Sequence, residues 1–119
     1  MHINGVIRFS PHELEAINNA IEYINQNFYK AITADELATD FKINIKKLQN
    51  GFIRKTGFTV HCYILNVRLT QAKALLSDLD EPIKTIHAKI GFRSQSHFGQ
   101  FFKKYVSSTP YQYRIQSLS

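Results

Sequence analysis

Two stretches of the chain repeat one another, and this internal repeat constrains the fold more than any other feature. Apolar positions in the first part of each copy lie 49 residues apart: Leu37, Phe41 and Ile43 match Ile86, Ile90 and Phe92. Positions in the second part lie 50 residues apart: Asn44, Leu48, Phe52, Gly57 and Thr59 match Ser94, Phe98, Phe102, Ser107 and Thr109. Chance similarity of amphipathic helices explains the apolar matches but not the matched helix caps, so we interpret the pattern as duplication of one unit.

Helical spacing dominates the whole chain, and no stretch alternates apolar and polar residues over the length of a strand. Ser10 and Glu13 form a capping box before the first apolar stripe. That stripe comprises Leu14, Ile17, Ile21, Ile24 and Phe28. A long pattern without Pro or Gly covers residues 59–79, and Pro82 follows it. The sequence therefore predicts an all-α fold of about seven helices.

Each copy of the repeat predicts two short helices joined by a tight turn, which is the helix-turn-helix motif. The predicted helix caps are Thr33, Asn44, Ser94 and Thr109, and Gly57 is a stop signal. We expect an N-terminal helix and a first helix-turn-helix over residues 1–59. A linker helix should follow over 60–79, and a second helix-turn-helix with a C-terminal helix over 80–119.

Charge is distributed unevenly along the chain, whose formal net charge is +6. Residues 1–41 carry a formal charge of −4, and residues 42–119 carry +10. A solvated basic surface would be unremarkable by itself, but this asymmetry favours a polyanionic partner.

The second helix of each copy has a polar face opposite its apolar one. The first copy presents Lys46, Lys47, Gln49, Asn50 and Arg54, and the second presents Gln95, Ser96, His97, Gln100 and Lys104. Gln and Asn can bind adenine edges bidentately, while Lys and Arg reach guanine acceptors and phosphates. Any surface helix has polar residues, but two such helices in matching motifs favour double-stranded DNA as the partner.

A helix of about 20 residues spans about 30 Å, and successive major-groove faces of B-DNA lie about 34 Å apart. One chain could therefore place two reading helices in successive major grooves as a monomer, unless it is fused to a dimerising domain. Such a chain acts as its own dimer without two-fold symmetry, so the preferred site should be asymmetric. The rigid linker limits how well both helices fit straight DNA, so some bending is expected.

The stretch "IGFRSQSHFGQFFKKYVSSTPYQYR", from Ile90 to Arg114, resembles the signature of AraC/XylS-type transcription regulators. "LATDFKINIKKLQNGFIRKTGFT" is similar to the first helix-turn-helix of that family, and "YILNVRLTQAKALL" is similar to its linker helix. The resemblance covers residues 14–115. It implies a sequence-specific DNA-binding regulator, often an activator that contacts RNA polymerase. Many relatives also carry a sensing or dimerising domain, so the chain is either a short member or a fragment.

The resemblance implies roles for individual residues. Base reading is expected from Lys46, Gln49, Asn50, Gln95, Ser96, His97 and Gln100. Phosphate binding is expected from Asn44, Lys47, Arg54, Lys55, Arg93, Ser94, Lys103 and Lys104. Four residues depart from the family pattern: Lys42, Gly51, His87 and Ser107. Of these, Gly51 lies inside a reading helix, where it should cost up to about 1 kcal/mol relative to Ala.

Other chemistries find little support. The histidines and the single cysteine lack metal-binding spacing, so neither a metal nor a cofactor is expected. No catalytic constellation is visible, and we expect no enzymatic activity. No apolar run is long enough to span a membrane, and we expect a cytoplasmic, nucleoid-associated protein. An RNA-binding helical module and a protein-interaction domain with a basic face remain the alternatives.

Overall fold

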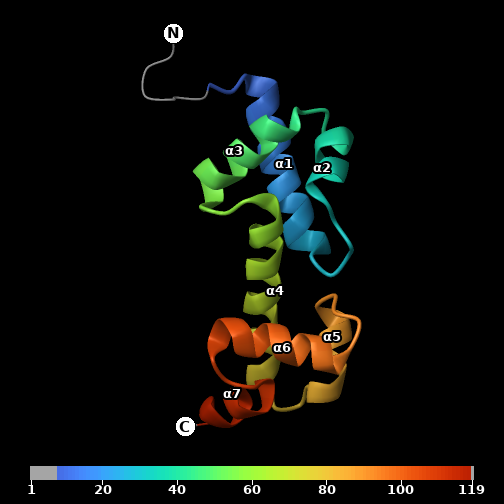
Figure 1. The fold of residues 1–119 in the computed structure, drawn as a ribbon, viewed down its shortest axis with the longest axis vertical. Helices are drawn as coiled ribbons and strands as arrows, with labels where there is room; N and C mark the ends of the chain where they lie inside the picture. Colours follow the sequence, from blue (N-terminus) through green and yellow to red (C-terminus); the bar gives the residue numbers. More distant parts are fainter. Residues whose placement is uncertain (1–7, 119) are drawn as a thin grey trace. The chain divides into compact units, whose positions relative to one another are not determined.

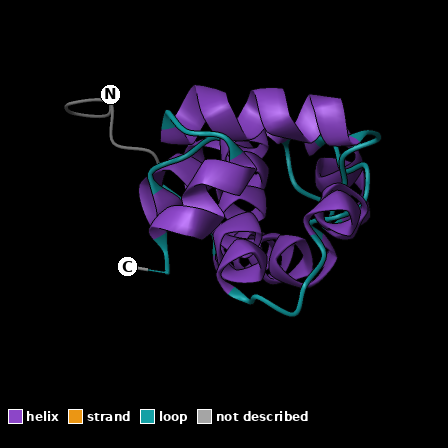
Figure 2. Cartoon of the chain, turned by 90° about the horizontal axis from the view of Figure 1, so that it is seen from below, coloured by secondary structure: helices purple, strands orange, loops and turns teal. Residues whose placement is uncertain are grey.

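The computed structural model describes residues 8–118, and all regular secondary structure in that range is helical (Figures 1 and 2). The seven helices are α1 (Pro11–Asn27), α2 (Ala34–Asp40), α3 (Ile45–Thr56), α4 (Val60–Ser77), α5 (Ile83–Lys89), α6 (Gln95–Val106) and α7 (Pro110–Gln116). The predicted all-α fold is confirmed.

The chain divides into two compact units. The first contains the residues up to Asn27 together with Ile32–Leu65, and the second contains Phe28–Ala31 together with the residues from Asn66 onward. The continuous helix α4 contributes its first residues to the first unit and the remainder to the second.

Local capping bonds set the starts of the helices as predicted. At α1, the Ser10 hydroxyl accepts the Glu13 N–H at 3.1 Å, and the Glu13 carboxylate accepts the Ser10 N–H at 2.8 Å. The side chains of four further residues cap helices in the same manner: Thr33, Asn44, Ser94 and Thr109. Each cap satisfies backbone N–H groups that have no partner within their own helix.

The core of the first unit forms where α2 and α3 pack with α1 (Figure 1). Its buried side chains include Ile17, Ile24, Leu37, Leu48 and Phe52, whereas Leu14 of the predicted stripe is exposed. Gly51, expected only to weaken α3, also has a packing role. A Cβ at this position would lie 2.2 Å from Ile17 Cδ1, so the glycine allows α3 to approach α1 closely.

Phenylalanines dominate the core of the second unit. The Phe92 ring centroid lies 4.7 Å from that of Phe101 and 6.1 Å from that of Phe98. Phe102 packs 5.8 Å from Phe98 and 5.4 Å from Tyr113 of α7. These rings join the turn before α6, α6 itself and α7 into one apolar core, and such aromatic pairs add stability beyond the area they bury.

Two arginines in the second unit bind backbone carbonyl groups. Arg114 of α7 donates to the carbonyls of Leu75, Leu76 and Asp78 at 2.8–3.2 Å, which caps the C-terminal end of α4. Arg68 donates to the carbonyl of Phe28 at 2.8 Å and to that of Lys30 at 3.0 Å.

The surroundings of Arg68 also explain why residue 91 is a glycine. Its guanidinium lies 5.4 Å from the Phe92 ring centroid, and burial lowers the pKa of Arg68 from its ordinary value. A Cβ on Gly91 would meet the Tyr29 carbonyl oxygen at 2.7 Å and the Arg68 guanidinium at 2.9 Å. Glycine is therefore favoured at position 91 for two reasons. It leaves room for these two groups, and it adopts the positive φ of 96° without steric cost.

Candidate nucleic-acid interface

The turns that present α3 and α6 have the same backbone hydrogen bonds. In the first unit the N–H of Ile43 binds the Ala38 carbonyl at 2.9 Å, and Lys42 adopts a φ of 55°. In the second unit the N–H of Phe92 binds the His87 carbonyl at 2.8 Å, next to Gly91. Donor and acceptor are each displaced by 49 residues, so the repeat seen in the sequence is also a repeat of turn geometry.

His87 occupies one of the positions that depart from the family pattern, and it contributes to this turn. Its Nδ1 lies 3.0 Å from the Phe92 carbonyl oxygen. Because a carbonyl only accepts, Nδ1 carries the hydrogen in this contact. The half-buried imidazole thus stabilises the turn before α6 as a hydrogen-bonded packing residue.

On α3, the three base-reading candidates differ in how freely they can reach a partner. Lys46 is exposed, and Asn50 is half-buried. The side-chain oxygen of Gln49 accepts the backbone N–H of Val60 at 2.9 Å, so it satisfies a donor in the first turn of α4. The amide NH₂ of Gln49 remains the group that could donate to a base edge.

The phosphate-binding candidates of the first unit all have partners within the protein. The Asn44 side-chain oxygen caps α3 by accepting the backbone N–H groups of Lys46 and Lys47. Lys47 Nζ donates to the Arg8 carbonyl at 2.7 Å and to Glu13 at 3.2 Å. Lys55 Nζ donates to Asn18 of α1 at 2.7 Å. Arg54 lies over the ring of Phe9, its guanidinium carbon 5.8 Å from the ring centroid.

The carboxylate of Glu13 lies beside one of these cations, Lys47. The Ser10 backbone N–H, which it accepts, lowers the pKa of Glu13 the most, and Lys47 lowers it further, while desolvation acts in the opposite direction. The acid is therefore held ionised beside Lys47. From the sequence, Glu13 was expected only as part of the helix cap, and its place at the interface was missed.

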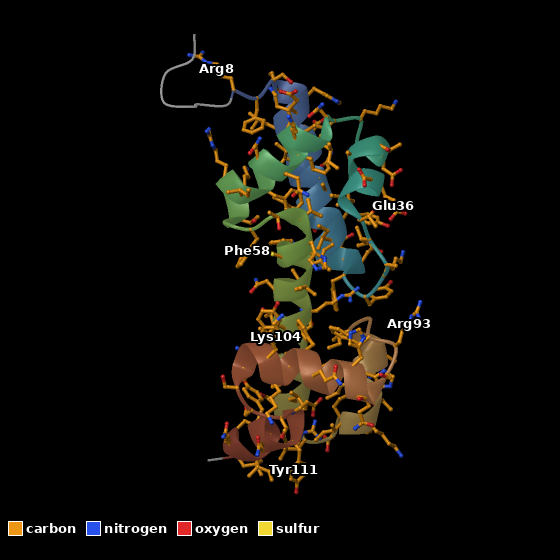
Figure 3. The ribbon with its side chains drawn as sticks, in the orientation of Figure 1. Arg8, Glu36, Phe58, Arg93, Lys104 and Tyr111 are labelled. Carbon is orange, nitrogen blue, oxygen red and sulfur yellow. The ribbon has the colours of Figure 1, made fainter. Side chains whose placement is uncertain are left out.

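In the second unit the candidates are more accessible. The four base-reading candidates Gln95, Ser96, His97 and Gln100 are all exposed on α6. Arg93, Lys103 and Lys104 are also exposed, and Figure 3 labels Arg93 in the turn before α6 and Lys104 on the helix itself. Ser94 caps α6 by accepting the His97 N–H at 3.0 Å. Within this unit α6 therefore presents one continuous polar face.

A hollow of about 390 Å³ lies beside this face, between α6, α7 and the start of α5. Its lining includes Gln95, Gly99 and Gln100 of α6 together with Pro110 and Tyr111 of α7. A Cβ on Gly99 would meet no atom within 4 Å, so the missing side chain contributes to the hollow. The exposed Tyr111 was not identified from the sequence, where it reads as an ordinary surface residue of the last helix.

The described part of the chain shows neither a metal site nor a membrane-spanning helix. Among residues 8–118, no group of three or more His, Cys, Asp or Glu side chains is arranged to hold a metal ion. Over the same residues, no helix combines the length and apolar character needed to cross a bilayer.

The turns, the caps and the polar faces of α3 and α6 define a double helix-turn-helix protein. A family model described as a helix-turn-helix domain matches residues 37–116. The chain belongs to this family, as a DNA-binding domain of the AraC/XylS type.

Known proteins agree with this assignment. The chain is 35% identical over 113 residues to the melibiose operon regulatory protein of Escherichia coli K12, covering 95% of this chain and 36% of that protein. It is 30% identical over 96 residues to the transcriptional activator RhaS of Yersinia pestis (strain Pestoides F), covering 81% and 35%. The chain thus spans about a third of the length of these relatives.

A solved structure shows the same fold. It is the DNA-binding domain of the global transcriptional factor AdpA, determined in complex with a target DNA. The TM-score is 0.76 at 20% identity, over 85% of this chain and 91% of that one.

Proposed function

We propose that this chain is the sequence-specific DNA-binding part of a transcriptional activator. In this proposal α3 and α6 enter successive major grooves of one asymmetric site. The observation that carries it is the repeated turn, which in each unit is followed by a helix with an exposed polar face. The family membership and the continuous helix α4, which contributes residues to both units, support it further.

Base reading is divided unequally between the two helices. On α6 four exposed side chains are available, and we assign Gln95, Ser96, His97 and Gln100 to base edges. On α3 we assign Lys46 and Asn50, with Gln49 contributing through its amide NH₂ because its oxygen is bound to Val60. The second unit should therefore specify more of the site than the first.

Phosphate binding provides affinity that does not depend on sequence. We assign this role to Asn44, Lys47, Arg54, Lys55, Arg93, Ser94, Lys103 and Lys104. Each cation that neutralises a phosphate releases a counterion, so affinity falls as salt rises. The lysines and arginines of the set should therefore account for much of the salt dependence of binding.

The remaining features of the proposal concern the regulator as a whole. Activation follows the relative RhaS, whose name describes a transcriptional activator. A direct contact with RNA polymerase, binding as a monomer in the absence of a dimerising domain, and a cytoplasmic, nucleoid-associated location belong to the same hypothesis.

Selection of bound duplexes from a random pool tests the proposal. We expect one asymmetric consensus with two separated blocks of preferred bases. In a library of single-base changes, Gln100→Ala should relax preference at one base pair by about 1–3 kcal/mol. Lys103→Ala should weaken all duplexes alike and flatten the salt slope by about one unit. Lys30→Ala, which removes a cation outside both reading helices, is the matched control.

Two results would contradict the proposal. Selection that yields no consensus would remove sequence-specific recognition. Tighter binding to structured RNA than to the selected duplex would instead favour an RNA-binding module.

A further inference from the structure

We propose that Arg8 and Phe9, which lie just before α1, are part of the DNA interface of the first unit. Arg8 and Phe9 join Lys47 and Arg54 of α3 in what we call the Phe9 cluster, a phosphate-binding site at the edge of the reading helix. This inference rests on the proposed function, since it extends the surface that α3 offers to DNA. No role of Arg8 or Phe9 was expected from the sequence.

Two cations of α3 lie over the Phe9 ring. Lys47 Nζ is 5.5 Å from the ring centroid, and the Arg54 guanidinium carbon is 5.8 Å from it. Lys47 and Arg54 are seven residues apart, which is about two helical turns, so they lie on one stripe of α3. The aromatic ring attracts both cations and restrains their side chains in the free protein.

Hydrogen bonds attach the same segment to α3. Lys47 Nζ donates to the backbone carbonyl of Arg8 at 2.7 Å and forms an ion pair with Glu13 at 3.2 Å. These contacts place the backbone of Arg8 against the reading helix. The Arg8 side chain is exposed and lies outside the helical ribbon of this unit (Figure 3). Arg8 therefore adds a third cation on the short stretch of backbone that Lys47 holds.

The cluster lies next to the reading face of α3. Lys47 follows Lys46 and Arg54 follows Ile53, so the stripe is rotated by about 100° from the side that carries Lys46. It lies on the side of α3 that faces α1, because Gly51 of the same stripe approaches Ile17. When a helix occupies a major groove, its flanks approach the phosphate backbones while its centre approaches base edges. A flank with three cations suits a phosphate.

The charges within the cluster are not cancelled. Glu13 is the single acid, and it neutralises one of the three cations. Among the described residues Arg54 has no carboxylate within ion-pair distance, and its close neighbour is the uncharged ring. Arg54, held by the aromatic ring, keeps its full charge for a ligand, whereas Lys47 shares its charge with Glu13 and contributes less. Phe9 is accordingly a positioning residue, and Arg8, Lys47 and Arg54 are the binding residues.

Duplex binding by single variants of the full chain tests the cluster. The variants are Phe9→Ala, Phe9→Leu and Arg8→Ala, with Lys30→Ala as the charge-matched control. The affinity for the selected duplex and for an unrelated duplex is measured over a range of salt concentrations. We expect both Phe9 variants to bind either duplex about fivefold to tenfold more weakly, because each variant loses the ring that restrains Lys47 and Arg54. Arg8→Ala should flatten the salt slope by about one unit, and Lys30→Ala should leave it unchanged.

Several outcomes distinguish this inference from the function on which it rests. Folded Phe9→Leu and Arg8→Ala proteins with wild-type affinity and salt slope would overturn the cluster and leave the proposed function intact. A loss confined to the selected duplex would also overturn it, because phosphate contacts weaken all sequences alike. If the unaltered chain bound no duplex, the proposed function and the cluster would both fail. Melting temperatures identify any variant whose weaker binding reflects unfolding.

Discussion

In the first unit the reading helix packs against α1, whereas in the second it packs into a cluster of phenylalanine rings. Gly51 and Phe101 occupy equivalent positions of the repeat, 50 residues apart. Gly51 allows α3 to approach Ile17, while Phe101 is 9% exposed and lies 4.7 Å from Phe92. The same turn can therefore be supported by two kinds of packing, and the smallest and one of the largest side chains can fill one position.

A second difference concerns the helix that follows each reading helix. In the first unit the Gln49 side chain accepts the N–H of Val60. The equivalent positions in the second unit are Gly99 and Pro110. Proline has no N–H, so the second unit needs no acceptor at position 99. The first unit has both the N–H donor of Val60 and its acceptor Gln49, and the second unit has neither. This explains why position 49 is Gln and the equivalent position 99 is Gly.

Glycine substitutions provide the largest expected contrast between the units. Gly51→Ala should lower the free energy of unfolding by about 1–3 kcal/mol, because the added methyl group collides with the buried Ile17. Gly99→Ala should raise it by about 0.5–1 kcal/mol, because alanine favours the helix and the site is open. Urea unfolding of both variants measures the two effects. Changes of the same sign would contradict the packing difference described above.

The Gln49 contact should have a smaller effect on stability. Gln49→Ala leaves the N–H of Val60 without its side-chain acceptor, and we expect a loss of about 0.5–1.5 kcal/mol. Gln100→Ala removes an exposed amide of α6 and should leave the unfolding free energy unchanged. Thermal and urea unfolding provide the comparison. Equal stability of the two variants would mean that the Val60 contact contributes nothing.

The smallest effect is expected where each reading helix ends. Gly57 and Ser107 are equivalent residues, and both adopt a left-handed conformation, with φ of 83° and 66°. Ser107→Gly should stabilise the protein by about 0.5–1 kcal/mol, since glycine adopts this conformation without steric cost. Gly57→Ser should destabilise it by a similar amount. Shifts in melting temperature of opposite sign are the expected readout, and a destabilised Ser107→Gly protein would contradict the steric explanation.

Much of this fold was predictable from the sequence. The caps Ser10, Thr33, Asn44, Ser94 and Thr109 form where they were expected, because each bonds a backbone N–H two or three residues away. Such contacts depend on local order alone. The all-α class followed from apolar spacing, and the exposed polar face of α6 followed from the same periodicity.

The candidate site was predictable in composition but not in arrangement. The expected cations and amides are present on α3 and α6, and their roles on DNA stay predictions. The spacing of polar residues could not predict that the side-chain oxygen of Gln49 accepts the N–H of Val60. The spacing also could not predict that Lys47 and Arg54 lie over the ring of Phe9, because about 40 residues separate the ring from those cations.

The sequence alone determined the helices, their caps, the repeat and the family, because these depend on short-range hydrogen bonds and on the periodicity of apolar residues. The tertiary structure decided which side chains meet. It made Gly51 a packing residue, directed Arg68 and Arg114 to backbone carbonyls, and brought Arg8 and Phe9 to the edge of α3. These contacts depend on how closely helices approach, and that distance is set by the combined shape of many side chains rather than by any local pattern.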